Sequence, residues 1–229
     1  MTAATAMPED GADGRAVRGV VFDLDGTLVD SWDVHRHALR HAAAEAGMGE
    51  PSSARLAAAQ RPTDLATVRA LVGDACLATA WPAYRREFLA RLGIAPPRAT
   101  AHAAETLRRL RASGLSIGVC TGRSHREAQA LLDVCALDVP LVIAREQAAP
   151  PKPAPTGLLA AVRALGLATR EALYVGDTAA DLRQGSAAGV QTLVLGTRGA
   201  RPRGQSPGSH LSELSELLAH TGCAERRAE

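Results

Sequence analysis

Two pairs of aspartates stand directly after apolar segments of this sequence, and the first pair is Asp23 and Asp25. They follow the apolar run 20–22 and precede Gly26. Because side chains two residues apart in an extended chain point the same way, both carboxylates would lie at the end of one buried strand. Their mutual repulsion and lost hydration favour a bound cation or a shared proton. In isolation, however, this pattern more often marks a strand that ends in a polar turn.

The second pair is Asp177 and Asp181. Asp177 follows the apolar segment 172–176, and Asp181 comes one helical turn later, so both carboxylates can face one cation. The same spacing suits helix capping, because Thr178 and Asp181 fit a capping box. Cation binding and helix capping therefore explain this pair about equally well when it is taken alone.

Two residues between the acid pairs suit a phosphoryl group. Thr121 follows the apolar segment 115–120 and is expected to offer its hydroxyl and its backbone amide at the start of a helix, together with Gly122. Lys152 is the single lysine among 26 Lys and Arg residues, and it lies between prolines. In a chain that otherwise uses arginine, this lysine is a candidate for a task that needs a compact ammonium. Helix capping by Thr121 and chance survival of Lys152 are the alternatives.

Taken in order, these motifs resemble the four signatures of the haloacid dehalogenase superfamily of phosphohydrolases, and in particular its phosphoglycolate-phosphatase-like group. The matching positions are residues 23–28 (Asp-x-Asp-Gly-Thr-Leu), Thr121, Lys152, Asp177 and Asp181. The joint match is far more specific than any of its parts. The resemblance implies that Asp23 is the nucleophile that forms an aspartyl-phosphate and that Asp25 is the general acid and base.

The resemblance also implies a Mg²⁺ cofactor and a set of residues around it. The metal ligands would be the carboxylates of Asp23 and Asp177 and the backbone carbonyl of Asp25. Asp181 would hold the outer coordination sphere. The residues that would bind the phosphoryl oxygens are Thr121, Gly122 and Lys152.

The rest of the sequence supplies the elements that must position these residues. Apolar segments predict five strands, at 20–22, 115–120, 139–144, 172–176 and 190–195. Helices are predicted at 100–112, from 124, at 156–165, from 178 and at 211–220, with a loop at 197–209. Thr100 and Ser124 are candidate caps of the first two helices. The alternation indicates an α/β fold with a doubly wound parallel sheet. The resemblance implies the strand order five-four-one-two-three, which places the first strand at a topological switch, where open sheets bind ligands.

A second unit, an all-helical insertion, is predicted between the two parts of the catalytic core. The insertion would comprise residues 31–97, and the core would comprise 17–30 and 98–222. Helices are expected at 33–46, 62–72 and 78–92, and strand signals are absent. Trp81, Tyr84 and Phe88 share a helix face and indicate an internal core of the insertion. By resemblance, the insertion is a small cap that closes over the active site and selects the substrate.

Arg61 is the candidate substrate residue of this cap. It stands in a predicted loop, 60–62, from which a guanidinium can reach a second anionic group on a substrate. A solvated surface arginine is the more common case. His35, His37 and His41 share the first predicted cap helix and are expected to be surface or packing residues rather than ligands.

Composition narrows the class of protein. At 229 residues the chain suits one domain with an insertion, or two small domains. A net charge of +2 and only two each of Trp, Tyr and Phe disfavour nucleic-acid binding. No apolar run approaches about 18 residues, so no membrane span is expected. Four cysteines without metal-ligand spacing predict reduced thiols in a cytoplasmic protein, and residues 1–16 are predicted to be a disordered tail.

Together these features predict a Mg²⁺-dependent phosphatase, monomeric or dimeric, that acts through an aspartyl-phosphate. Its substrate would be a small phosphorylated metabolite, either a phosphoglycolate-like acid or a sugar phosphate. A sugar phosphomutase of the same superfamily is one alternative, which Thr27 weakly disfavours. A non-catalytic binder of phosphorylated metabolites is the other, and Asp25 argues against it because a binder needs no general acid.

Overall fold

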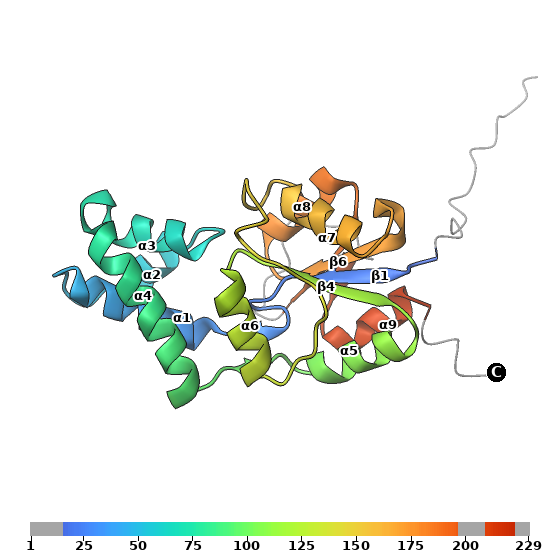
Figure 1. Cartoon of the computed structure of the whole chain (residues 1–229), viewed down its shortest axis with the longest axis horizontal. Coiled ribbons are helices and arrows are strands. Elements are labelled where there is room, and N and C mark those ends of the chain that lie inside the picture. The colour runs from blue at the N-terminus through green and yellow to red at the C-terminus, as the bar shows by residue number, and fades with distance from the viewer. Residues whose placement is uncertain (1–15, 197–208, 223–229) are drawn as a thin grey trace, which may run out of the picture.

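A parallel β-sheet forms the centre of the computed structural model, which describes residues 16–196 and 209–222 (Figure 1). Within those residues, six strands run in the order β5-β4-β1-β6-β7-β8. They are β1 (Gly19–Phe22), β4 (Ser116–Cys120), β5 (Val142–Ile143), β6 (Ala172–Gly176), β7 (Gln191–Leu195) and β8 (His210–Leu211). The five predicted strands are present in the predicted order, with β1 between β4 and β6. The chain therefore has the expected α/β fold.

Strand β1 shows why an unbroken apolar run becomes a central strand. Val20 and Phe22 belong to the hydrophobic cluster on one face of the sheet, and Val21 belongs to the cluster on the other face. All three are fully buried. Successive side chains of β1 point to opposite faces of the sheet, and helices cover both faces. Each side chain is therefore buried away from water, and a polar residue fits at none of these positions.

Helices cover both faces of the sheet in the core (Figure 1). One face carries α5 (Ala103–Ala112), α6 (His125–Val134) and α9 (Leu217–His220), and the other carries α7 (Thr156–Ala164) and α8 (Ala179–Ala188), with the short η1 (Thr169–Glu171) before β6. The predicted capping boxes at Ser124 and Thr178 are confirmed. The predicted cap at Thr100 is wrong: α5 begins after His102, and the Thr100 amide donates to the carbonyl of Leu28 at 2.9 Å.

The segment predicted as one helix at 211–220 instead forms three short elements. These are β8, the 3₁₀ turn η3 (Leu214–Glu216) and α9. Leu211 is fully buried and pairs with Leu195, so this backbone satisfies part of the open edge of β7. The apolar spacing that suggested a helix is thus divided between a strand and two helical turns.

The helical cap is formed by the first four helices that follow β1 in the chain (Figure 1). They are α1 (Trp32–Glu45), α2 (Ser53–Ala59), α3 (Asp64–Val72) and α4 (Asp74–Ile94). Tyr84 and Phe88 are fully buried and Trp81 stacks on Tyr84 at 5.7 Å, which confirms the predicted aromatic core. Helix α2 was not predicted, and the exact limits of the cap and core stay predictions.

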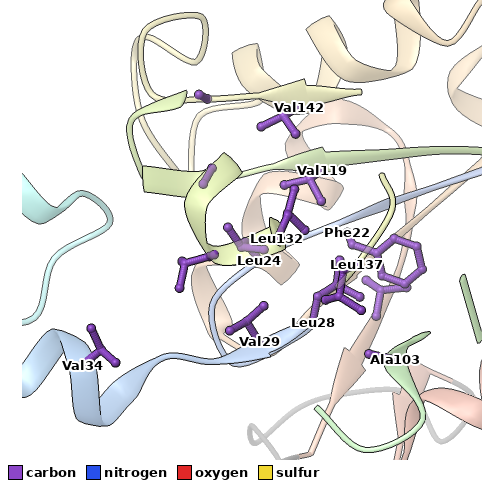
Figure 2. Close-up of a cluster of buried hydrophobic side chains, with 14 of the residues drawn as sticks. Phe22, Leu24, Leu28, Val29, Val34, Ala103, Val119, Leu132, Leu137 and Val142 are labelled. Carbon is purple, nitrogen blue, oxygen red and sulfur yellow. The ribbon is translucent and has the colours of Figure 1, made fainter. Parts of the chain in front are cut away.

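Two short strands that were not predicted join the cap to the core. Strand β2 (Val29–Asp30) pairs antiparallel with β3 (Arg98–Ala99), so the two ends of the cap lie side by side. Buried hydrophobic contacts also join the two units. Val34, near the start of α1 in the cap, belongs to the same buried cluster as Phe22 and Val119 in the core (Figure 2).

Several predictions concern other parts of the chain. Cys76, Cys120 and Cys135 are free thiols, as expected, whereas Cys223 lies outside the described residues. Residues 1–15 of the predicted tail and 197–208 of the predicted loop also lie outside them. Among the helices that the structure describes, none is both long and apolar enough to cross a membrane.

Candidate active site

The loop after β1 holds the first acid pair. Between the two acids, Leu24 is fully buried together with Leu28 (Figure 2), and Asp23 and Asp25 line a cavity on the other side. The Asp23 amide donates to the carbonyl of Val175 at 2.8 Å, which ties this loop to the end of β6. Alternation along the extended chain therefore fixes which residues of the motif face the core and which face the cavity.

Gly26 lets this loop approach the second acid pair. Its φ is +80°, and a Cβ at this position would lie 2.1 Å from Oδ2 of Asp177. Any larger residue would strain the backbone and displace Asp177. The loop after β1 and the turn after β6 therefore meet only because residue 26 is glycine.

Three carboxylates gather where these segments meet. Asp23, Asp177 and Asp181 each offer an oxygen atom within 4.8 Å of the others. Burial, with the charge of Asp181, raises the pKa of Asp177 to about 7, and burial raises the pKa of Asp23 well above its usual value. Oδ1 of Asp177 is buried and has no hydrogen-bond partner among the described residues. Such a cluster is destabilised by its own charge and is suited to a cation.

Lys152 supplies positive charge to this cluster. Its Nζ donates hydrogen bonds to Oδ1 of Asp23 and, at 2.7 Å, to Oδ1 of Asp181. Burial opposes the charged form of this side chain, but the carboxylates of Asp181 and Asp23 outweigh it and hold the pKa of Lys152 well above its usual value. The ammonium therefore stays charged and is fixed beside Asp23.

Asp181 orients the lysine. Its Oδ1 also accepts a hydrogen bond from Tyr174 at 2.6 Å, and its Oδ2 accepts bonds from the amide and hydroxyl of Thr178. Burial alone would raise the pKa of Asp181, but Lys152, Thr178 and Tyr174 together lower it. Both oxygens of Asp181 are therefore already used by the protein. Sequence reasoning missed Tyr174, which was predicted only as a residue of an apolar strand.

Thr121 and Gly122 follow β4 on the other side of β1. Thr121 is buried, and its Oγ1 accepts a hydrogen bond from the Arg123 amide at 3.2 Å. The prediction that the Thr121 amide is free for a ligand is wrong, because this amide donates to the carbonyl of Ile143 at 3.0 Å in the sheet. A Cβ at Gly122 would lie 2.0 Å from the carbonyl oxygen of Pro62, so the cap touches the core here.

One cavity of about 510 Å³ between the core and the cap brings the predicted residues together. The predicted site residues that line it are Asp23, Asp25, Arg61, Thr121, Gly122, Lys152, Asp177 and Asp181. Arg61 is exposed, and its guanidinium donates to the carbonyls of Ala58 and Gln60 at 3.0 and 2.7 Å. Its contact with a substrate stays a prediction.

Arg123 is the principal residue that sequence reasoning missed. Its Nε lies 2.9 Å from both carboxylate oxygens of Asp25, and its NH1 donates to Asp64 at 3.2 Å and to Tyr84 at 3.1 Å. Burial would raise the pKa of Asp25, but the charge of Arg123 and the hydrogen bonds from Arg123 and Ser31 lower it. The only signal in the sequence was the position of Arg123, two residues after Thr121.

The cap wall of the cavity contains two further buried polar groups. Burial raises the pKa of Asp64 to about 6, although Arg123 works against this. Burial and the charge of Arg123 lower the pKa of His35 to about 3, so the imidazole is neutral, with Nδ1 2.7 Å from the Tyr84 hydroxyl and Nε2 3.2 Å from Oε1 of Gln60. His35 thus packs inside the cap, while His37 and His41 are only partly buried.

Comparison with known proteins gives one consistent result. The family described as haloacid dehalogenase-like hydrolase matches residues 20–195. A phosphoglycolate phosphatase of Rhodospirillum rubrum is 33% identical over 205 residues, which cover 78% of this chain and 79% of that protein. A phosphoglycolate phosphatase of Cereibacter sphaeroides is 34% identical over 215 residues, which cover 87% of this chain and 97% of that protein.

Solved structures share the fold. CbbY from Rhodobacter sphaeroides in complex with phosphate superimposes with a TM-score of 0.76 at 21% identity, over 90% of this chain and 99% of that one. A predicted phosphoglycolate phosphatase from Haemophilus somnus superimposes with a TM-score of 0.77 at 20% identity, over 90% and 98%. At these identities the likeness concerns the architecture of core and cap.

Proposed function

The chain belongs to the haloacid dehalogenase-like hydrolase family, and from that premise we propose that it is a Mg²⁺-dependent phosphatase that acts through an aspartyl-phosphate on Asp23. It is a hydrolase of phosphoric monoesters, as its relatives named phosphoglycolate phosphatase are. The observation that carries the finer proposal is the buried group of Asp23, Asp177 and Asp181 with the Lys152 ammonium bonded to two of its members.

The donor set fits Mg²⁺. The ion prefers oxygen ligands, and Oδ1 of Asp177 is buried without a hydrogen-bond partner among the described residues. The carboxylates of Asp23 and Asp177 and the backbone carbonyl of Asp25 would hold the ion. Asp181 would stay outside this set, since its oxygens already accept bonds from Lys152, Tyr174 and Thr178. When bound, Mg²⁺ supplies positive charge to the oxygens of the transferring phosphoryl group.

Asp23 acts as the nucleophile in this proposal. One of its carboxylate oxygens attacks phosphorus, the bond from phosphorus to the ester oxygen breaks, and an acyl phosphate forms. The Lys152 ammonium and the Thr121 hydroxyl stabilise the charge on the phosphoryl oxygens. Because Lys152 is held by Asp181, its position is set before the substrate arrives.

Asp25 handles the protons. Because Arg123 and Ser31 favour its ionised form in the free site, the Asp25 carboxylate takes up a proton from solvent before it protonates the departing alkoxide in the first step, and it accepts a proton from the attacking water in the second. The second step breaks the acyl phosphate and returns Asp23 to its carboxylate form. The side chain of Asp25 is 31% exposed against 10% for Asp23, which leaves room for a leaving group and then a water.

The substrate is a small phosphorylated metabolite, either a phosphoglycolate-like acid or a sugar phosphate. A cavity of about 510 Å³ shared by core and cap suits a molecule of that size. Arg61 would contact a second anionic group of the substrate from the cap. We expect a cytoplasmic enzyme that acts as a monomer or dimer and binds neither nucleic acid nor membranes.

Release of free phosphate from a panel of monoesters tests the proposal. Wild type should release phosphate with Mg²⁺, lose activity in excess EDTA and regain it with Mg²⁺, and Ca²⁺ should inhibit because its looser coordination misplaces Asp23. Asp23→Asn should abolish turnover, whereas the matched control Asp33→Asn, on an exposed side chain of α1, should not. Turnover by Asp23→Asn, or full activity in excess chelator, contradicts the proposal. Transfer of phosphate within a sugar without its release would identify a phosphomutase instead.

A further inference from the structure

Arg123 joins the cap to one acid of the active site. We propose that it is a positioning residue: contacts from Asp64 and Tyr84 in the cap fix the guanidinium, and the guanidinium fixes the carboxylate of Asp25. The orientation of the general acid then depends on the seating of the cap. This inference rests on the proposed phosphatase function, because it assigns a role to Asp25 in leaving-group departure.

On the core side, the contact fixes both oxygens of Asp25. Nε lies 2.9 Å from Oδ1 and from Oδ2, NH2 lies 2.8 Å from Oδ1, and the Ser31 hydroxyl donates to the same Oδ1. A planar fork against a carboxylate restricts rotation of the carboxylate more than a single donor does. Arg123 is 4% exposed, so water does not compete strongly for these bonds.

On the cap side, three residues hold the other edge of the same guanidinium. NH1 donates to Oδ2 of Asp64 at 3.2 Å and to the hydroxyl of Tyr84 at 3.1 Å, and the guanidinium carbon lies 4.2 Å from the centre of the Phe88 ring. Asp64 begins α3, and Tyr84 and Phe88 belong to α4. Because the guanidinium is rigid and planar, the groups that hold NH1 also set the direction of Nε and NH2. Movement of the cap away from the core would therefore release Asp25 as well.

The competing explanation is that Arg123 is only a latch, a contact that holds the cap against the core without orienting Asp25. The chain contains matched controls for this explanation. Arg85 in α4 pairs with the fully buried Glu127 at 3.3 Å, and Arg145 lies 5.3 Å from the centre of the Trp81 ring. Both contacts join cap and core through an arginine, and neither involves Asp25. Loss of a latch alone should look the same at Arg123 and at Arg85.

The comparison of two leaving groups separates the explanations. The value of kcat/KM reports the steps up to departure of the leaving group, if that departure is irreversible. An alkoxide needs a proton from Asp25, whereas nitrophenolate leaves without one. The test compares kcat/KM for phosphoglycolate and ribose 5-phosphate with kcat/KM for para-nitrophenyl phosphate, each with Mg²⁺. The variants are first checked for folding by circular dichroism.

Misplacement of Asp25 should affect the alkyl esters selectively. In Arg123→Lys, the alkyl-to-aryl ratio of kcat/KM should fall about tenfold or more, because a small misplacement of a catalytic group lowers the rate by at least that factor. In Tyr84→Phe and Asp64→Asn, which leave the arginine in place, it should fall about two- to fivefold, the effect of one weakened hydrogen bond. Arg85→Met should lower all three kcat/KM values by a common factor and leave the ratio within about twofold of wild type.

An unchanged ratio in Arg123→Lys overturns the proposal, as does a fall of the same size in Arg85→Met. If Arg123→Lys does not fold, the ratio in Tyr84→Phe and Asp64→Asn decides in the same way. Failure of the underlying function has a different signature. In that case wild type releases no phosphate from any of the three esters, or Asp23→Asn retains turnover.

Discussion

Replacement of Lys152 by arginine keeps the positive charge and changes its shape, so it tests what the ammonium contributes. Nζ is bonded to Asp23 and Asp181, and the side chain is 10% exposed. On the side between β4, α8 and the 150–155 loop, the free space is a cavity of about 10 Å³. That is no more than the roughly 10–15 Å³ needed by one water molecule, so a guanidinium must either displace these neighbours or extend into the cavity of about 510 Å³ that Lys152 also lines, where the phosphoryl group would bind.

Two costs follow from this geometry. Moving the charge away from the phosphoryl site removes one preorganised electrostatic contact, which is worth about 10²–10³ in turnover, or roughly 2.7–4 kcal/mol. Overpacking the surrounding side chains costs about 1–3 kcal/mol of the free energy of unfolding. Lys152→Met avoids overpacking but leaves two buried carboxylates without their cation, which costs about 3–5 kcal/mol of stability. We expect kcat/KM to fall about a hundredfold or more in both variants.

Steady-state hydrolysis of para-nitrophenyl phosphate with saturating Mg²⁺ measures the loss, and thermal unfolding measures stability. Arg126→Lys, on an exposed side chain of α6, is the matched control for exchange of the two cationic residues and should retain wild-type kinetics. A Lys152→Arg variant within a few-fold of wild type would refute the reasoning. It would mean that any cation suffices at this position and that the lone lysine survived by chance.

Three other substitutions test separate parts of the site. In Asp25→Asn, rapid-quench assays with para-nitrophenyl phosphate should show a burst of about one equivalent of nitrophenol and then slow turnover, because the water lacks its base; steady turnover without a burst contradicts this role. Asp64→Asn should change the pH dependence of stability. Burial raises the folded pKa of Asp64 from 3.8 to about 6, so stability present below pH 4 is lost as the pH rises through 6. Unfolding at pH 4 and pH 7 should show wild type losing up to about 3 kcal/mol relative to Asp64→Asn, and parallel profiles would exclude this account. Gly26→Ala places a Cβ 2.1 Å from Asp177 and should weaken Mg²⁺ binding, measured by calorimetry, about tenfold or more. Gly47→Ala has a similar positive φ but an open site, and equal Mg²⁺ affinities in the two variants would refute the steric argument.

The acid loop, which is the loop after β1 with Asp23, Asp25 and Gly26, was predictable because its signals are local. An apolar run ends at Phe22, two carboxylates follow at alternate positions, and a glycine closes the turn. Each of these features constrains the backbone within a few residues. The order of the five main strands was implied by the family resemblance, and the alternation of strands and helices agreed with it.

The features that were missed depend on contacts between distant segments. Arg123 is 98 residues from Asp25 and 59 from Asp64, and no periodicity in the sequence indicates which helices meet at its guanidinium. The amide of Thr121 is used by the carbonyl of Ile143, a pairing that only the register of β4 and β5 determines. Helix α2 is short and rich in alanine, so its sequence carries no clear apolar stripe.

The β2–β3 pair makes the cap a replaceable module. Val29 lies opposite Ala99 and Asp30 opposite Arg98, so the chain leaves the core and returns to it at one place. A different helical segment grafted between these two strands would keep both ends together and leave the six-stranded sheet unbroken. The same sheet and acid loop can therefore acquire a new preference for leaving groups through exchange of one insertion, with Arg123 as the core residue that each new cap would have to accommodate.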